Sequence, residues 1–223
     1  MSKPTDCRYA GNMYTNPSKA DYVDIKGLQL VRRDSIPLVR DVSNAILNAI
    51  MHDRDPHKAI DEARACILRV LRGEEPLEKF VVSKTLRTDY KNTSQPHLVV
   101  ATKILRRTGA HTPSGTRVPY VFIQDLANPD GLMATRAEDP EFVKANGLKL
   151  DALQYIRNQL ESPITSLLDV LVDDPSKEVF GDENIAPLLH DMETRQALVV
   201  KEAKRVRKNV AAGQREITSY FRN

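Results

Sequence analysis

Prolines that stand just before apolar residues at helical spacing constrain the fold of this chain most strongly. Segments 55–73 and 139–147 each begin with Asp-Pro, a cap residue and a first-turn proline, and each end in glycine. Pro37 precedes a third such segment, whose apolar stripe is Leu38, Val42, Ala45, Ile46, Ala49 and Ile50. All three segments therefore predict helices that bury one face.

Short β-forming segments lie between these helices. Residues 8–15 and 22–31 flank a turn-forming stretch at 16–19, which predicts a hairpin of two strands. Residues 80–84 and 118–123 predict two further strands. The chain is therefore predicted to be α+β and mostly helical.

The C-terminal half is predicted to be helical with one interruption. Residues 95–107 predict a helix, and 151–172 predict a long amphipathic helix. Pro163 falls inside the second, so we expect a kink or two separate helices there. Residues 173–189 are polar and turn-rich, and 190–210 predict a basic helix.

Charge is concentrated locally rather than spread over the chain. The formal net charge is only +3, but basic clusters occur at 32–33, 103–107 and 201–208. Such clusters can meet phosphate groups, or they can simply be the solvated face of a helix. Both interpretations stay open for each cluster.

Cysteine and histidine usage argues against a disulfide framework or a zinc site. The two cysteines are Cys7 and Cys66, and five histidines show no paired metal spacing. Cys66 falls near the apolar stripe of 55–73, where a small apolar filler is favoured over a reactive thiol. With no bilayer-spanning apolar run and no signal-peptide pattern, we expect an intracellular, reduced protein.

The last ten residues carry the pattern Q-x-x-I-x-x-Y-F, formed by Gln214, Ile217, Tyr220 and Phe221. One helical turn would place the three apolar residues on one face, able to enter an apolar groove, while Gln214 stays free to hydrogen-bond. The pattern resembles the peptide by which replication proteins dock onto the ring-shaped sliding clamp. A frayed terminus that carries two aromatic residues is the alternative.

Residues 8 to about 172 resemble the C-terminal part of family B DNA polymerases, meaning the end of the palm and the whole thumb. Five segments carry the resemblance in order: Arg8-Tyr9-Ala10-Gly11 (K-K-R-Y), 24–34 (K-G…V-R-R-D), Val82-Ser83-Lys84 (V-I-S-K), 115–121 (G-x-R-V-P-Y-V) and 159–164 (Q-L-x-x-P). Where the family has two lysines before Arg-Tyr, this chain has Asp6-Cys7, so either that grip is altered or residues 1–7 are not homologous.

The resemblance implies roles in holding primer–template duplex DNA. Arg8 and Tyr9 would lie against the duplex near the primer terminus, Lys26 and Lys84 would reach phosphates, and Gly27 would allow close backbone approach. Contacts from Arg and Lys to phosphate suit a protein that must track every sequence.

Three arginines have two interpretations each. Arg32 and Arg33 either contact DNA or form an internal ion pair with Asp34 at the palm–thumb junction. Arg117 either contacts DNA or has a structural role.

The resemblance also implies a domain order. We expect a C-terminal palm segment at 1–36, a thumb at 37–175, a polar linker and basic helix at 176–210, and a mobile clamp-binding tail at 211–223.

The family's catalytic motifs, D-x-x-S-L-Y-P and Y-G-D-T-D, do not occur in the sequence. Their aspartates hold the two metal ions of polymerisation. The family places them upstream of the point where this chain begins. We therefore expect no polymerisation by this chain alone and no cofactor on it, with Mg²⁺ on the missing catalytic part.

Two hypotheses follow for the function. The chain is either the C-terminal thumb fragment or a split subunit of a DNA polymerase, with a catalytic polymerase chain as partner, or a non-catalytic accessory protein or remnant. Its site of action would be a nucleus, a cytoplasm or a viral replication site, depending on the host. Both predict duplex DNA and the sliding clamp as partners, and neither predicts a membrane.

Overall fold

The computed structural model describes residues 9–16, 22–26, 35–125, 128–129 and 131–220. Their backbone divides into two compact units. The first comprises Met1–Val82 and Gln154–Ala186, and the second comprises Ser83–Leu153 and Pro187–Asn223. The chain thus passes from the first unit to the second, returns to the first, and ends in the second.

A hairpin begins the first unit, as predicted. Strands β1 (Tyr9–Met13) and β2 (Tyr22–Lys26) pair antiparallel, with Tyr9 opposite Lys26 and Met13 opposite Tyr22. Most of the predicted turn, at 17–19, lies outside the described residues.

Two helices follow, and both begin where the prolines predicted. Helix α1 (Pro37–Asn48) continues as a π-helical turn, η2 (Ala49–Asp53). Helix α2 (Pro56–Arg72) is capped by Asp55, whose side chain accepts a hydrogen bond from the backbone N–H of Lys58 at 3.1 Å. It ends at Gly73, whose φ of 70° is a left-handed conformation that glycine adopts without steric cost.

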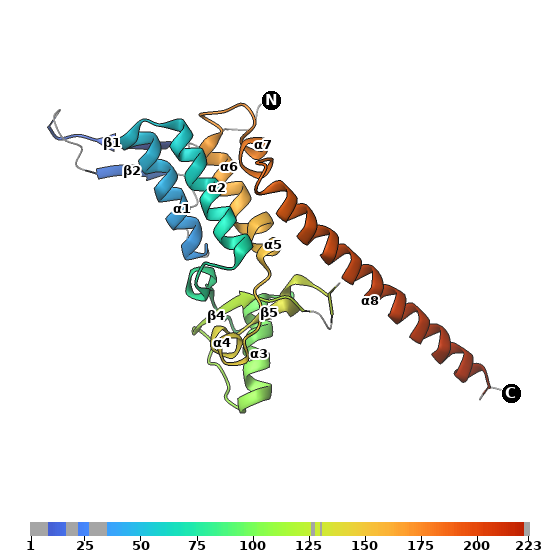
Figure 1. Cartoon of the computed structure of the whole chain (residues 1–223). Coiled ribbons are helices and arrows are strands. Elements are labelled where there is room, and N and C mark those ends of the chain that lie inside the picture. Colours follow the sequence, from blue (N-terminus) through green and yellow to red (C-terminus); the bar gives the residue numbers. More distant parts are fainter. Residues whose placement is uncertain (1–8, 17–21, 27–34, 126–127, 130, 221–223) are drawn as a thin grey trace, which may run out of the picture. The chain divides into compact units, whose positions relative to one another are not determined.

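The core of the first unit lies between α1, α2, α6 (Glu161–Leu168) and α7 (Pro175–Phe180), labelled in Figure 1. Helices α2 and α6 each contact the other three. Its fully buried side chains include Leu38, Ile46, Ile67, Ile164, Leu168 and Val179. Cys66 is only 1% exposed, and its burial raises the pKa of the thiol to about 12. The prediction that Cys66 fills space in the core is therefore confirmed.

The segment predicted as one long helix with a proline is indeed broken. It consists of α5 (Ala152–Tyr155), a π-helical turn η5 (Ile156–Leu160) and α6 (Glu161–Leu168). Pro163 has no N–H for the carbonyl four residues earlier, and its ring would clash with that carbonyl in a regular helix. The wider π turn just before Pro163 relieves this conflict, so the distortion precedes the proline.

The prediction of a polar, turn-rich stretch at 173–189 needs correction. It contains helix α7 (Pro175–Phe180) and the start of α8 (Ala186–Tyr220). Val179, Phe180 and Ile185 are buried. These few apolar residues stand among polar neighbours, and the segment is too short for a helical repeat to be recognised in the sequence. The predicted basic helix at 190–210 is part of α8, which continues as helix over 211–220, where we expected a separate tail.

The second unit is built on a small sheet with the order β3-β4-β5. Its strands are β3 (Val82–Thr85), β4 (Arg117–Phe122) and β5 (Ala137–Glu138), and β4 and β5 are antiparallel. The predicted strand at 80–84 starts later than expected, because Phe80 ends a 3₁₀ helix, η3 (Leu77–Phe80).

Helices complete the second unit. Helix α3 (Pro96–Thr108) contacts β4, β5 and the 3₁₀ helix η4 (Met133–Arg136), and α4 (Pro140–Asn146) contacts β4. Helix α4 is capped by Asp139 and ends at Gly147, as the sequence predicted.

Candidate nucleic-acid interface

Two cations at the end of β3 are available to a ligand. Lys84 is half-buried in β3, and Arg87 is exposed just after it. Among the described residues, neither side chain makes a hydrogen bond or an ion pair. Their positive charge is therefore not neutralised within this part of the chain.

The backbone around these cations is held in place. Leu86 donates its N–H to the Thr116 carbonyl at 2.8 Å and accepts a hydrogen bond from the Gly115 N–H, also at 2.8 Å. Gly115 has a φ of 88°, a conformation that side-chain-bearing residues rarely adopt. The backbone that carries the two cations is thus fixed by hydrogen bonds. A fixed backbone lowers the conformational entropy that is lost when the cations bind a ligand.

Hydrogen bonds of a tyrosine and a histidine hold the loop that follows β3. The backbone N–H of Arg87 donates to the Tyr90 hydroxyl at 2.7 Å, and that hydroxyl lies 2.8 Å from Nε2 of His97 on α3. Burial of His97, together with the charges of Lys84 and Arg87, lowers the pKa of its ring. His97 is therefore neutral at pH 7 and acts as a hydrogen-bonding anchor.

Sequence reasoning identified Lys84 but missed Arg87 and Tyr90. The available signal was their closeness in the sequence, because Arg87 follows Lys84 by three residues and Tyr90 follows Arg87 by three. The buried partner that gives the loop its shape, His97, has no such signal.

Arg117 makes contacts of the structural kind. Its Nη2 donates to the Ser83 carbonyl at 2.7 Å and to Ser83 Oγ at 2.8 Å, and Nε also donates to Oγ at 3.1 Å. These bonds join β4 to β3 beside Lys84. They support the structural interpretation of Arg117, while a DNA contact from it stays a prediction.

The hairpin register brings two other predicted residues together. Tyr9 and Lys26 are directly opposite each other in the β1–β2 pair, although many residues separate them in the sequence. Arg8, Gly27, Arg32 and Arg33 lie outside the described residues.

The predicted clamp-binding residues lie at the end of α8. Gln214, Ile217 and Tyr220 belong to the helix, and Phe221 lies outside the described residues.

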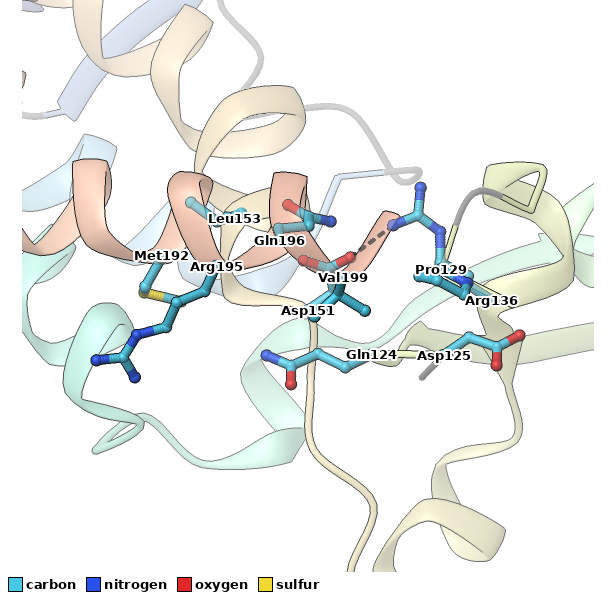
Figure 2. Close-up of a pocket in the computed structure, with 10 residues that line it drawn as sticks. All are labelled: Gln124, Asp125, Pro129, Arg136, Asp151, Leu153, Met192, Arg195, Gln196 and Val199. Atoms are coloured by element: carbon cyan, nitrogen blue, oxygen red, sulfur yellow. Dashed lines mark hydrogen bonds and ion pairs between the residues drawn. The ribbon is translucent and has the colours of Figure 1, made fainter. Parts of the chain in front are cut away.

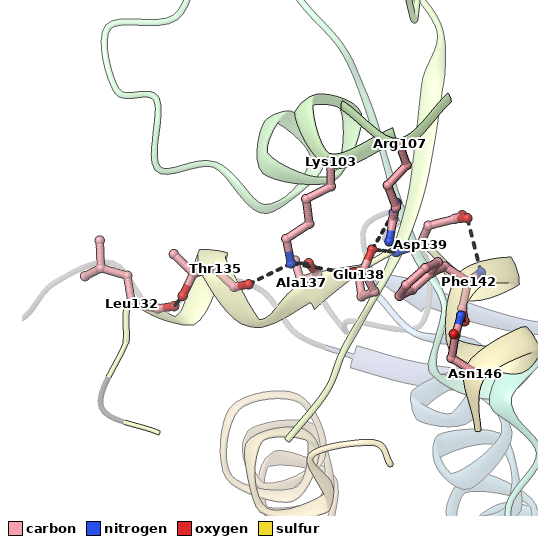
Figure 3. A network of polar contacts seen from close by, with 9 residues as sticks. All are labelled: Lys103, Arg107, Leu132, Thr135, Ala137, Glu138, Asp139, Phe142 and Asn146. Carbon is pink, nitrogen blue, oxygen red and sulfur yellow. Dashed lines mark hydrogen bonds and ion pairs between the residues drawn. The ribbon is translucent and has the colours of Figure 1, made fainter. Parts of the chain in front are cut away.

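Two residues of the basic cluster at 103–107 have a different role from both of those considered, whereas Arg106 is exposed. Figure 3 shows Lys103 donating from Nζ to the carbonyls of Thr135 at 2.9 Å and Ala137 at 2.8 Å. Lys103 also lies 3.3 Å from Glu138 Oε2, and Arg107 Nη2 lies 2.7 Å from Glu138 Oε1. These two cations connect α3 to the segment before α4, so they are neither a free phosphate site nor a solvated face.

Glu138 is the centre of this network. Its burial alone would raise the pKa of its carboxyl group. The hydrogen bonds from Arg107 and from the Asp139 N–H, with the positive charges of Lys103 and Arg107, nevertheless hold that pKa below its ordinary value. The Arg107 guanidinium also lies over the Phe142 ring, 3.8 Å from its centre, so both Glu138 and Phe142 hold it.

A cavity of about 280 Å³ lies in the second unit between α8 and the loops that follow β4. Its lining residues, shown in Figure 2, are Gln124, Asp125, Pro129, Arg136, Asp151, Leu153, Met192, Arg195, Gln196 and Val199. Arg136 Nη1 donates to Asp151 Oδ2 at 2.8 Å across it. The lining holds two arginines and two aspartates, and Arg195 is also paired with Asp191 outside it, so this cavity has no surplus positive charge to attract phosphate.

Neither a metal cluster nor a membrane-spanning helix is found among the described residues. Within the described part of the chain, His, Cys, Asp and Glu side chains form no group of three or more that could hold a metal ion. The helices of that part include none with the length and apolar character to cross a bilayer.

Comparison with known proteins identifies what the chain is similar to. The family model described as DNA polymerase family B matches residues 5–171. The DNA polymerase of Paramecium bursaria Chlorella virus NY2A is 46% identical over 215 residues, which is 96% of this chain and 24% of the viral protein. The DNA polymerase delta catalytic subunit of Caenorhabditis elegans is 34% identical over 175 residues, covering 77% of this chain and 16% of that protein.

A solved structure shares the fold. The family B DNA polymerase of the archaeon Pyrobaculum calidifontis matches with a TM-score of 0.57 and 24% identity, covering 74% of this chain and 20% of that one. The chain therefore spans about a quarter or less of the length of these relatives.

Proposed function

Because the chain belongs to DNA polymerase family B, we propose that it supplies the thumb that grips primer–template duplex DNA during replication. One observation carries this proposal: Lys84 and Arg87 are unpaired cations, among the described residues, on a backbone that the neighbouring strand and loop hold in place. Lys84 also belongs to one of the segments that resemble the family.

The chemistry of these two residues suits a grip that ignores sequence. Phosphate contacts position a duplex without reading its bases, and each neutralised phosphate releases a counterion. Lysine and arginine side chains can follow the backbone as the duplex advances. Arg117, bonded to Ser83, would stiffen the strand that carries Lys84.

The hairpin would be the end of the palm. Its register places Tyr9 and Lys26 opposite each other, which would let both contribute to one stretch of the duplex near the primer terminus. Arg8 and Gly27 would adjoin them in sequence.

We propose that the catalytic aspartates and their two Mg²⁺ ions belong to a part of the polymerase other than these 223 residues, either the rest of the same polypeptide or a separate subunit. The sequence contains neither D-x-x-S-L-Y-P nor Y-G-D-T-D, and the carboxylates of the described residues do not cluster in a way that fits a metal. No step of nucleotide transfer is assigned to residues of this chain.

The C-terminal peptide would tether the assembly to the sliding clamp. Gln214, Ile217 and Tyr220 follow one another along the last turns of α8, with Phe221 next. Apolar residues three and four apart would enter an apolar groove together.

A non-catalytic accessory protein that binds duplex DNA and the clamp is the second candidate. The same unpaired cations support it, since they need no catalytic partner to hold phosphate. The two candidates differ in whether a second polypeptide carrying the catalytic motifs is found with this chain.

Duplex binding is tested by fluorescence anisotropy of the full chain with a labelled primer–template duplex over a series of salt concentrations. We expect the double variant Lys84→Gln, Arg87→Gln to bind all sequences more weakly. Its slope of log affinity against log salt should fall by about 2, close to one per phosphate contact. Unchanged affinity and slope would show that these cations do not grip DNA.

The partner is tested by purifying the tagged chain from its native cells and identifying what accompanies it by mass spectrometry. A larger polypeptide with D-x-x-S-L-Y-P and Y-G-D-T-D would support the split polymerase. Recovery of the clamp and DNA without such a polypeptide would favour the accessory protein.

A further inference from the structure

We propose that one face of α8, formed by Lys201, Lys204, Arg205 and Lys208, is a second binding surface for the backbone of duplex DNA. We call it the α8 basic face. The inference rests on the proposed function, because it names where a duplex-gripping chain makes further phosphate contacts.

The α8 basic face gathers more unpaired positive charge in one short segment than the pair Lys84 and Arg87 does. Residues 201–208 contain five basic side chains and one acidic one, so their net charge of +4 exceeds the +3 of the whole chain. All four residues of the face are exposed. Among the described residues, Lys201, Lys204 and Lys208 have no hydrogen-bond or ion-pair partner, and Arg205 pairs only with the exposed Glu202.

Several other cations of the chain have a structural role, because they form ion pairs within the fold. Lys103 and Arg107 are bound to Glu138, Lys79 lies between Asp41 and Glu75, and Arg69 lies 2.6 Å from Glu75. Each of these cations links elements of the fold. The α8 basic face links nothing among the described residues, so a structural role does not account for it.

The geometry of the face matches a phosphate backbone. Positions 201, 204, 205 and 208 are three, four and seven apart, and therefore share one side of the helix. They extend over about 10 Å at a rise of 1.5 Å per residue. One DNA strand presents a phosphate every 3.4 Å along the axis, so the face can meet about three phosphates.

The opposite side of α8 contacts its own unit over only part of its length. Val199, Ala203, Val206 and Val210 lie about 180° around the helix from the basic face. Val199 lines the cavity in Figure 2, and Arg207 hydrogen-bonds to Asn128 at 2.5 Å. Val206 and Val210 are exposed, at 51% and 55%, so this part of α8 projects into solvent and its basic face is accessible.

The apolar side also argues for nucleic acid over an anionic membrane. Basic amphipathic helices that lie on membranes insert large apolar side chains such as Trp, Phe and Leu. The stripe here consists of three valines and one alanine, residues 186–210 contain no Trp, Phe or Tyr, and the exposed Leu188 and Leu198 lie outside the stripe. The apolar area that this stripe could insert into a membrane is small, whereas the positive charge needed to bind a duplex is present.

The test compares the full chain with the variant Lys201→Gln, Lys204→Gln, Arg205→Gln, Lys208→Gln, using a labelled mixed-sequence duplex and a salt series. The slope of log affinity against log salt should fall by about 3, and affinity at moderate salt should fall on the order of a hundred-fold. Circular dichroism verifies that the variant keeps its helix content. The variant Lys201→Arg, Lys204→Arg, Lys208→Arg keeps the positive charge and should bind the duplex as tightly as the original chain does.

A matched control removes the same charge elsewhere. Arg40, Arg72, Lys149 and Lys177 are exposed and have no recorded side-chain partner among the described residues. Their replacement by glutamine changes the net charge equally, so a slope close to that of the original chain is expected. Equal losses in the control and the α8 variant would overturn the proposal, since the effect would then be one of net charge.

Two further outcomes separate this inference from the proposed function. If the double variant Lys84→Gln, Arg87→Gln binds duplex DNA more weakly but the α8 variant binds it normally, the inference is wrong and the proposed function stands. If the unaltered chain shows no salt-sensitive binding of duplex DNA, both the inference and the proposed function are wrong. If the α8 variant loses only its binding to vesicles of phosphatidylcholine and phosphatidylserine, the face serves a membrane and the proposal is wrong.

Discussion

Replacing Glu138 with glutamine tests the internal network of the second unit. The Glu138 side chain is 7% exposed and lies 2.7 Å from Arg107 Nη2 and 3.3 Å from Lys103 Nζ. Glutamine keeps the size but removes the charge, which leaves two cations without their anion. Removing one partner of a buried ion pair costs about 3–5 kcal/mol. Because the Lys103 and Arg107 side chains are each 29% exposed and can regain water, we expect a loss of about 2–3 kcal/mol.

A matched control is available on α8. Glu202 lies 2.7 Å from Arg205 Nη2, the same distance as Glu138 from Arg107, but its side chain is 55% exposed. Glu202→Gln should therefore cost no more than about 0.5 kcal/mol. The assay is urea denaturation followed by far-ultraviolet circular dichroism, with amide hydrogen exchange of β4 and β5 to assign the loss to the second unit.

The pH dependence gives an internal check on the cause. Hydrogen bonds and charges hold the pKa of Glu138 below its ordinary value in the folded chain. Its contribution to stability is then present above the unfolded-state pKa and is lost as the pH falls through the folded-state pKa. The difference between the original chain and Glu138→Gln should therefore shrink at acidic pH. Equal costs for Glu138→Gln and Glu202→Gln at pH 7 would refute the reasoning.

Two other changes have sharp expected outcomes. Because burial raises the pKa of Cys66 to about 12, the thiol should react with iodoacetamide at pH 8 far more slowly in the folded chain than in urea; equal rates would contradict its burial. Tyr220→Ala with Phe221→Ala should weaken binding to the purified sliding clamp more than about thirty-fold, measured by fluorescence titration, and leave duplex affinity unchanged. Thr218→Ala is the control, and undiminished clamp binding by the double variant would remove the terminal-peptide proposal.

Local signals were sufficient for most helix boundaries. Asp55 and Asp139 cap α2 and α4, and Gly73 and Gly147 end them, because caps and left-handed stops depend on residues adjacent in the sequence. The proline at 163 predicted a distortion, but its position before the proline depends on how the neighbouring turns are packed. Helix α7 was missed because it is short and packs partly against α2, which lies far away in the sequence.

The candidate site was only partly predictable for the same reason. Lys84 was identified from a family motif, but the bond between Tyr90 and His97 that shapes the following loop was not. Lys103 and Arg107 looked like an available basic cluster because their partner, Glu138, lies more than thirty residues away. A sequence shows that a residue is charged, and only its surroundings show whether that charge is already neutralised.

The sequence by itself determined the family, the α+β class and the helices that begin at prolines, since these depend on neighbouring residues and on ordered motifs. Tertiary structure decided which cations are free. Folding brings Glu138 to Lys103 and Arg107 and brings Ser83 to Arg117, but it brings no acid to Lys84 or to Lys204 among the described residues. Neutralisation requires an oppositely charged atom within a few ångströms, and such distances between remote residues are set by packing.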